Sequence, residues 1–122
     1  MGAEFTLVVI KSWDIENLKA FYEDLGIEFQ EERHGDGSKH YSANLGGITF
    51  EIYPKKKSEL EKESKPSRGT GLGFKVKNLE EVLNRRLVMH VIKIVSPIEE
   101  TPWGRRAVVK DPDGRRVELY DS

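Results

Sequence analysis

The 122-residue sequence contains no cysteine. Disulfide bonds, zinc sites built from thiolates and a cysteine nucleophile are therefore excluded. An excess of charge is also missing, because 20 basic residues balance 21 acidic ones and leave a formal net charge of −1. A chain with this balance has no general electrostatic attraction for nucleic acid or for an anionic membrane surface. We therefore expect neither of them as a partner.

Long apolar segments are absent as well. No stretch approaches the roughly 20 apolar residues that a membrane-spanning helix requires. The first residues, MGAEFTLVVIKS, have neither the basic start nor the apolar centre of a signal peptide. A chain of 122 residues has the ordinary size of one domain. We therefore expect a single-domain protein of the cytoplasm.

What the sequence does contain is one order of elements written twice. A strand pattern, an amphipathic helix pattern and three further strand patterns fill residues 5–53, and the same order returns in residues 72–120. Between them lies a charged polar run, which predicts a surface linker at residues 55–68. The pattern predicts an α+β protein with two βαβββ modules, at about residues 4–54 and 69–121.

The first and second halves contain further matched features. Strand patterns of the first half fall at residues 5–10, 27–32, 39–45 and 48–53, and those of the second at 72–76, 91–95, 105–110 and 115–120. Ser12 or Asp14 can cap the first helix, and Asn78 with Glu81 forms a capping-box pattern for the second. Asp14 and Asn78, the candidate caps of the two helices, are 64 residues apart, which gives the offset between the two halves.

The segments FEIYP, from Phe50, and VELYD, from Val117, are nearly copies of each other. Side chains alternate along a strand, so Glu51 shares one face with Tyr53, and Glu118 shares one with Tyr120. If each helix covers one face of its sheet, the other faces form a common concave surface on which Glu51 and Glu118 meet. Solvent-facing glutamates and ordinary packing of the tyrosines across strands are the alternatives.

Three segments resemble the vicinal oxygen chelate superfamily, the group of glyoxalases, bleomycin resistance proteins and extradiol dioxygenases. They are DIENLKAFYEDLGIEF from Asp14, GGITFEIYP from Gly46, and PWGRRAVVKDPDGRRVELYDS from Pro102. The resemblance covers nearly the whole chain apart from the charged run. It implies that two βαβββ modules form a cupped mixed sheet and that the protein is a homodimer.

Metal-dependent members of this superfamily hold a divalent ion with side chains from the first and last strands of both modules. The resemblance places the two first-strand positions, where the family commonly has histidine, at Leu7 and Gly71, and the last-strand positions at Glu51 and Glu118. Two carboxylates without imidazoles hold an ion weakly, in the manner of Mg²⁺ rather than Zn²⁺. We therefore expect no tightly bound metal.

The chain has three histidines, two of which we expect to be exposed. His34 lies in a turn-rich segment and His90 near the end of the second helix, whereas His40 lies on a predicted strand that can line the concave surface. His40 alone does not restore the missing ligand set. The alternative is a weakly held divalent ion bound by Glu51 and Glu118 with help from His40.

The sequence therefore favours a protein that binds a small molecule, aromatic or cationic, against aromatic walls and an acidic floor. The predicted contact residues are Glu51, Glu118, Tyr53, Tyr120, Trp103, His40 and Arg105. A metal-dependent lyase, isomerase or dioxygenase of the same superfamily, using Glu51 and Glu118, is the alternative. No residue is singled out as catalytic, and the sequence leaves open whether the chain is an enzyme.

Overall fold

The fold is seen in a computed structural model that describes residues 2–56, 70–89 and 93–122. The chain divides into two compact units, which we call the first module, residues 1–62, and the second module, residues 63–122. Most of the predicted linker, and His90, lie outside the described residues. Among the described residues, no helix is both long enough and apolar enough to span a membrane.

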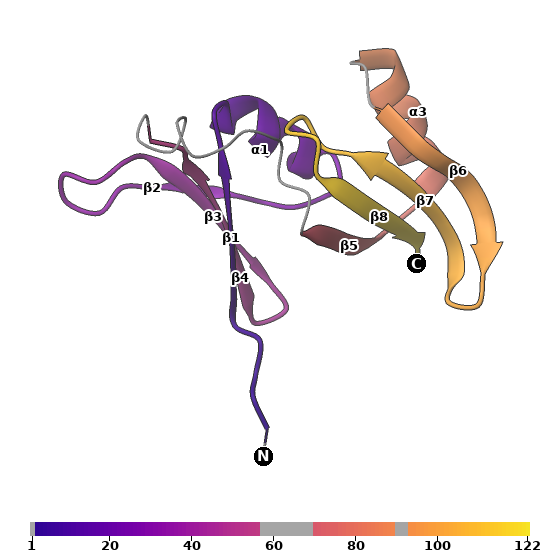
Figure 1. Cartoon of the computed structure of the whole chain (residues 1–122), viewed down its shortest axis with the longest axis horizontal. Helices are drawn as coiled ribbons and strands as arrows, with labels where there is room; N and C mark the ends of the chain where they lie inside the picture. The colour runs from indigo at the N-terminus through magenta and orange to yellow at the C-terminus, as the bar shows by residue number, and fades with distance from the viewer. Residues whose placement is uncertain (1, 57–69, 90–92) are drawn as a thin grey trace. The chain divides into compact units, whose positions relative to one another are not determined.

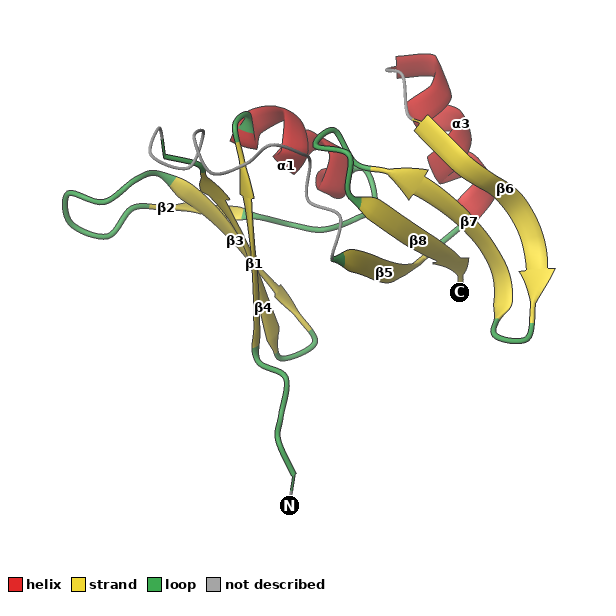
Figure 2. Ribbon diagram, viewed as in Figure 1, coloured by secondary structure: helices red, strands yellow, loops and turns green. Residues whose placement is uncertain are grey.

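In its described residues, 2–56, the first module is a four-stranded mixed sheet with one helix (Figures 1 and 2). Strand β1 runs parallel to β4, and the other neighbouring strands are antiparallel, in the order β1-β4-β3-β2. Its elements are β1 (Leu7–Ser12), α1 (Ile15–Glu23), β2 (Gln30–Glu32), β3 (His40–Leu45) and β4 (Ile48–Pro54).

The second module repeats this arrangement with the strand order β5-β8-β7-β6. Strand β5 is parallel to β8, and the remaining pairs are antiparallel. Its elements are β5 (Gly71–Val76), α3 (Leu79–Met89), β6 (Lys93–Thr101), β7 (Gly104–Lys110) and β8 (Arg116–Asp121). The predicted order of two βαβββ modules is confirmed, although β2 is shorter than its apolar pattern suggested and β6 extends farther.

Local sequence determines where each helix begins. The Asp14 carboxylate accepts a hydrogen bond from the Asn17 backbone N–H at 3.0 Å and caps α1. The Asn78 side chain accepts one from the Glu81 N–H at 3.2 Å, and its amide donates to the Glu81 carboxylate at 3.2 Å. This is a variant of the predicted capping box, because the glutamate binds the side chain of Asn78 rather than its backbone.

The core of the first module lies between α1 and its sheet. Leu18, Phe21 and Tyr22 are buried on the inner side of the helix, and the Tyr22 ring meets Phe50 of β4 edge-on with centroids 5.2 Å apart. Each fully buried large apolar side chain contributes roughly 1.5–3 kcal/mol. Because Phe50 faces the helix, Glu51 lies on the opposite surface, which we call the helix-free face of the sheet.

The two modules use the same strand register. Val9 lies opposite Glu51 in the parallel pair of the first module, and Gly73 lies opposite Glu118 in the second. On the antiparallel side, Ser42 is the partner of Glu51 and Val108 is the partner of Glu118. Each position of one helix-free face therefore has a defined counterpart on the other.

Candidate ligand-binding site

The helix-free face of the second module carries a hollow of about 600 Å³. Its lining residues come from three strands and the turn between β6 and β7, and they are Lys75, Trp103, Arg106, Glu118 and Tyr120. The sheet register brings them together, since Lys75 and Arg106 both lie opposite Tyr120 on the two strands that flank β8.

Hydrogen bonds organise the floor of this hollow. Arg106 Nη1 donates to Glu118 Oε1 at 3.2 Å, and the Tyr120 hydroxyl donates to the same oxygen at 3.3 Å. The pKa of Arg106 is raised, chiefly by its hydrogen bond with Tyr120 and also by the charge of Glu118. The Glu118 carboxylate is thus already paired with a cation, so the floor is not a bare negative charge.

Trp103 forms the apolar part of the hollow. Its side chain is 78% exposed although it is among the largest apolar groups of the chain. The turn that holds it is fixed by Thr101, whose hydroxyl accepts from the Trp103 N–H at 3.1 Å and donates to the Gly104 carbonyl at 2.7 Å. An indole held by an ordered turn and left open is suited to stacking with a flat molecule.

The corresponding surface of the first module contains an imidazole instead of a guanidinium. His40 is 1% exposed and stacks on Tyr53, with ring centroids 4.1 Å apart and planes 10° apart. Its Nε2 lies 3.2 Å from the Tyr53 hydroxyl and 3.8 Å from Glu51 Oε2. The pKa of the Tyr53 hydroxyl is raised, first by burial and then by the negative charges of Glu51 and Glu32.

The structure groups the predicted site residues by module. Glu51, Tyr53 and His40 lie together in the first module, and Glu118, Tyr120 and Trp103 lie together in the second. Arg105 lies apart from the hollow. It forms ion pairs with Asp121, at 2.9 Å, and with Glu80 of α3, which places it on the helix side of its sheet.

Sequence reasoning did not select Arg106 and Lys75, although both line the hollow. Because side chains alternate along a strand, Arg105 and Arg106 face opposite sides of the sheet. The sequence alone does not show which of them shares a face with Glu118. Pairing of Arg106 with Tyr120 across the sheet decides this. With the strand register known, Arg106 would have been predicted as the contact residue in place of Arg105.

The residues that the resemblance places at the superfamily's metal positions do not form the usual ligand set of a tightly held ion. Leu7 offers an apolar side chain and Gly71 none, so neither expected first-strand position carries a side-chain ligand atom. Glu118 is engaged by Arg106. A zinc or iron site needs about three protein ligands, including imidazoles in the usual sets.

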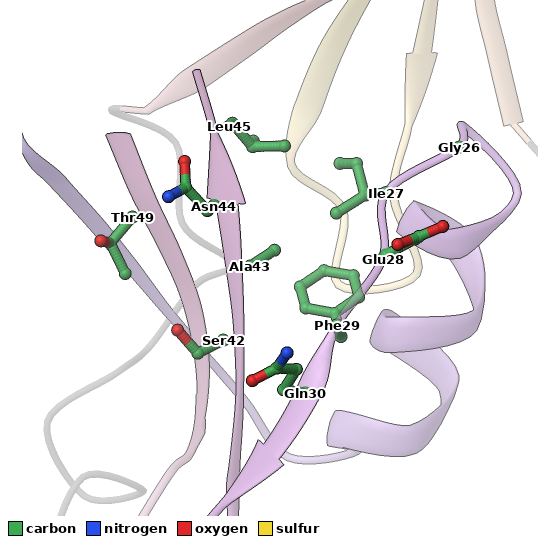
Figure 3. A pocket seen from close by; sticks show the side chains of 10 residues that line it. All are labelled: Gly26, Ile27, Glu28, Phe29, Gln30, Ser42, Ala43, Asn44, Leu45 and Thr49. Atoms are coloured by element: carbon green, nitrogen blue, oxygen red, sulfur yellow. The ribbon is translucent and has the colours of Figure 1, made fainter. Parts of the chain in front are cut away.

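A second hollow, of about 660 Å³, lies at the edge of the first sheet (Figure 3). Strand β2 pairs with β3 only from Gln30 to Glu32, so the segment before it leaves the edge of β3 uncovered. Half of the labelled residues are polar, and Glu28 is the one titratable group among them. They include neither a cation nor an indole such as Lys75, Arg106 and Trp103 supply beside Tyr120, so this hollow is the weaker candidate.

The sequence model described as the Glyoxalase/Bleomycin resistance protein/Dioxygenase superfamily matches residues 7–119. No curated protein matches the chain. Among solved structures, a hypothetical protein from S. aureus, SA1046, gives a TM-score of 0.75 at 16% identity, covering 100% of this chain and 95% of that one.

Two further structures of the same fold carry more informative descriptions. TnmS3, an antibiotic binding protein from Streptomyces sp. CB03234, gives a TM-score of 0.70 at 19% identity, with 98% of this chain and 95% of that chain covered. A glyoxalase/bleomycin resistance protein/dioxygenase family enzyme from Burkholderia phytofirmans PsJN gives 0.68 at 20% identity, with 98% of each chain covered. At these identities the likeness establishes the fold alone.

Proposed function

Because this chain belongs to the glyoxalase/bleomycin resistance protein/dioxygenase superfamily, we propose that it binds a small, flat aromatic molecule without a tightly held metal at the superfamily's position. The observation that carries the proposal is the exposed Trp103 beside a hollow that also contains Arg106 and Tyr120. A volume of about 600 Å³ suits a small-molecule ligand, since such sites span roughly 300–1,000 Å³.

Charge narrows the class of ligand. Two cations, Lys75 and Arg106, and one carboxylate, Glu118, line the hollow, and the carboxylate is already paired. A purely cationic ligand therefore fits less well than an aromatic one that carries a carboxylate, phenolate or carbonyl oxygen. Such an oxygen accepts hydrogen bonds from Lys75 or Arg106 while the ring stacks on Trp103.

Binding without turnover is the simpler of the two functions considered from the sequence. The absence of ligand atoms at Leu7 and Gly71 weighs against a metal-dependent lyase, isomerase or dioxygenase that uses Glu51 and Glu118. A structural relative described as an antibiotic binding protein supports a binding role for this fold. We include in the proposal that the protein works as a homodimer, which its molar mass in solution will test.

The test is a titration with planar aromatic compounds in three matched forms: carboxylates, neutral amides and amines. Tryptophan fluorescence reports binding, and the carboxylates should bind most tightly. Trp103→Ala should weaken their binding at least tenfold, about 1.4 kcal/mol, because it removes the stacking surface. Trp13→Ala is the matched control, since Trp13 is 48% exposed but lies in the first module. This variant should bind the carboxylates as tightly as the wild type does.

Calorimetry must accompany the fluorescence, because each variant removes one of the two tryptophans that supply the signal. Equal affinity of Trp103→Ala and wild-type protein, or tighter binding of amines than of carboxylates, would contradict the proposal. Failure of every aromatic compound to bind would contradict it as well.

A further inference from the structure

Two histidines and a glutamate meet where β2 turns back into β3, on the first module. Glu32, His34 and His40 each offer one ligand atom, and these atoms lie within 4.8 Å of one another. His34 Nε2 is 3.5 Å from Glu32 Oε2, and the rings of His34 and His40 have centroids 5.1 Å apart. Sheet register contributes to the grouping, because Glu32 lies directly opposite His40.

The buried member of this cluster is held in one orientation. His40 Nδ1 lies 3.2 Å from the Ser38 carbonyl oxygen, which can only accept, so Nδ1 carries the proton of the neutral ring. Nε2 therefore keeps its lone pair. A backbone carbonyl that fixes the tautomer and the ring plane in this way is the usual partner of a metal-binding histidine.

We propose that the β2–β3 hairpin binds one divalent transition metal, such as Zn²⁺, through Glu32, His34 and His40. Nitrogen and carboxylate donors together suit Zn²⁺, Ni²⁺ or Cu²⁺ better than Mg²⁺ or Ca²⁺, which prefer oxygen alone. These ligands come from the second and third strands and their turn. The site is thus distinct from the first-strand and last-strand positions at which the superfamily places its metal.

The cluster needs a modest closure to reach metal-binding distances. Tetrahedral ligands at about 2.0–2.1 Å from zinc lie roughly 3.3 Å from one another. Glu32 and His34 supply the movement, because their side chains are 33% and 74% exposed, while His40 stays fixed. Glu51, whose Oε2 is 3.8 Å from His40 Nε2, is not one of the three ligands, but its negative charge lies close enough to help neutralise the ion.

Metal binding at His40 has a consequence for its neighbour. The Tyr53 hydroxyl is 3.2 Å from Nε2, and it lies over the face of the His40 ring because the two rings are stacked. An ion bound in the ring plane at Nε2 would therefore sit close to this hydroxyl and change its surroundings. The tyrosine absorption and near-ultraviolet circular dichroism of the protein should change when Zn²⁺ is added, with a stoichiometry of one ion per chain.

The test is a competition titration of the tag-free protein with Zn²⁺ and a chromophoric chelator. Wild-type protein should bind one ion, and His34→Ala and Glu32→Gln should each weaken binding at least tenfold. Both substitutions change exposed or half-buried side chains, so the fold should persist. His90→Ala, which removes a histidine from the second module, is the control and should bind as the wild type does. X-ray absorption of the zinc complex should show two imidazole ligands.

Absence of stoichiometric binding would overturn the proposal. Wild-type affinity in His34→Ala would also overturn it, as would loss of binding in Glu118→Gln, which would place the ion at the superfamily's position. These outcomes do not depend on whether the protein binds an aromatic molecule, because the titration uses the metal alone and none of the three proposed ligands lines the Trp103 hollow.

Discussion

The two modules share one register, yet the residue beside the tyrosine differs between them. Tyr53 stacks on His40 in the first module, whereas Tyr120 lies opposite Arg106 in the second. An imidazole nitrogen suits a metal ion, whereas a guanidinium that already holds Glu118 suits an acceptor on a ligand. The duplicated scaffold thus keeps its strand pairing while its two helix-free faces have acquired different chemistry.

What the modules have in common is the attachment of the helix. Glu16 of α1 forms an ion pair with Lys39 at 3.1 Å, and Glu80 of α3 forms one with Arg105. Both glutamates are the second residue of their helix, where a negative charge is favourable. Arg105 is therefore the counterpart of Lys39 in fixing the helix, which explains why it does not line the hollow.

The turns between the last two strands of each module provide the largest expected contrast. In the second module Asp111 accepts from the backbone N–H groups of Asp113 and Arg115, at 2.9 and 3.0 Å, and from Arg115 Nη1 at 2.8 Å. Both side chains of this ion pair are almost fully buried. In the first module, the exposed Asn44 side chain accepts from the Gly47 N–H at 2.9 Å.

Asp111→Ala should therefore lower the free energy of unfolding by about 3–5 kcal/mol, because it removes the closer carboxylate partner of the buried Arg115, leaving Asp113 at 3.5 Å, and also the acceptor of two turn N–H groups. Asn44→Ala, the matched change in the first module, should cost only about 0.5–1.5 kcal/mol. Urea denaturation monitored by circular dichroism measures both. Equal losses would show that the two turns contribute alike and would remove this difference between the modules.

The neighbouring arginines of β7 give a second contrast. Arg106→Met should cost about 1–3 kcal/mol, since the half-buried Glu118 loses its charged donor. Arg105→Met removes ion pairs that are more exposed and should cost at most about 1 kcal/mol. The same denaturation experiment compares them. A larger loss in Arg105→Met would mean that the ion pairs attaching α3 contribute more to stability than the hydrogen bonds in the floor of the hollow.

The first strands differ in a smaller way. Strand β1 presents Leu7 and Val9 on its helix-free face, whereas β5 has Gly71 and Gly73 at the same register. A Cβ at Gly73 would meet the nearest atom, the Glu118 carbonyl oxygen, at 3.9 Å, an ordinary contact. The backbone conformation does not require glycine at this position. The glycines of β5 therefore matter because they leave room on the helix-free face, not because of their backbone angles.

Gly73→Ala should therefore raise the free energy of unfolding by about 0.5–1 kcal/mol, because alanine restricts the unfolded chain without straining the strand. Thermal and urea denaturation check this. A matched Gly46→Ala variant, in the turn of the first module where φ is +61°, should instead be destabilised. Destabilisation by both substitutions would indicate that β5 needs its glycine for a reason beyond steric fit.

The order of elements could be predicted because each depends on local spacing, such as the apolar residues that recur along α1 and the glycines that end the strands. The faces of Glu51 and Glu118 followed from alternation for the same reason. Which arginine joins Glu118, and that His34 lies near His40, depend on register and turn geometry between separate strands. A single strand does not encode its register, so these contacts required the structure.

The smallest expected effect is on the stability of the fold at acidic pH. The Glu16 carboxylate accepts a hydrogen bond from the Tyr41 hydroxyl, which lies 2.6 and 2.8 Å from its two oxygens. This contact is specific to the first module, because Ala107 takes the place of Tyr41 in the second. The hydrogen bond from Tyr41, followed by that from Lys39, holds the pKa of Glu16 below its ordinary value of 4.5. A carboxyl group with a lowered pKa stabilises the fold above its unfolded pKa and loses this contribution as the pH falls through the folded value.

The free energy of unfolding of the wild type should therefore decline more steeply below pH 4.5 than that of Glu16→Gln. Tyr41→Phe, which removes the principal cause of the shift, should flatten the profile in the same direction. Solvent screens the contribution, because the Glu16 side chain is 58% exposed. Urea denaturation at a series of acidic pH values measures the slopes. Parallel profiles in wild type and Glu16→Gln would mean that neither Tyr41 nor Lys39 lowers the pKa of Glu16, and a Tyr41→Phe profile equal to that of the wild type would mean that the hydroxyl adds nothing to the ion pair.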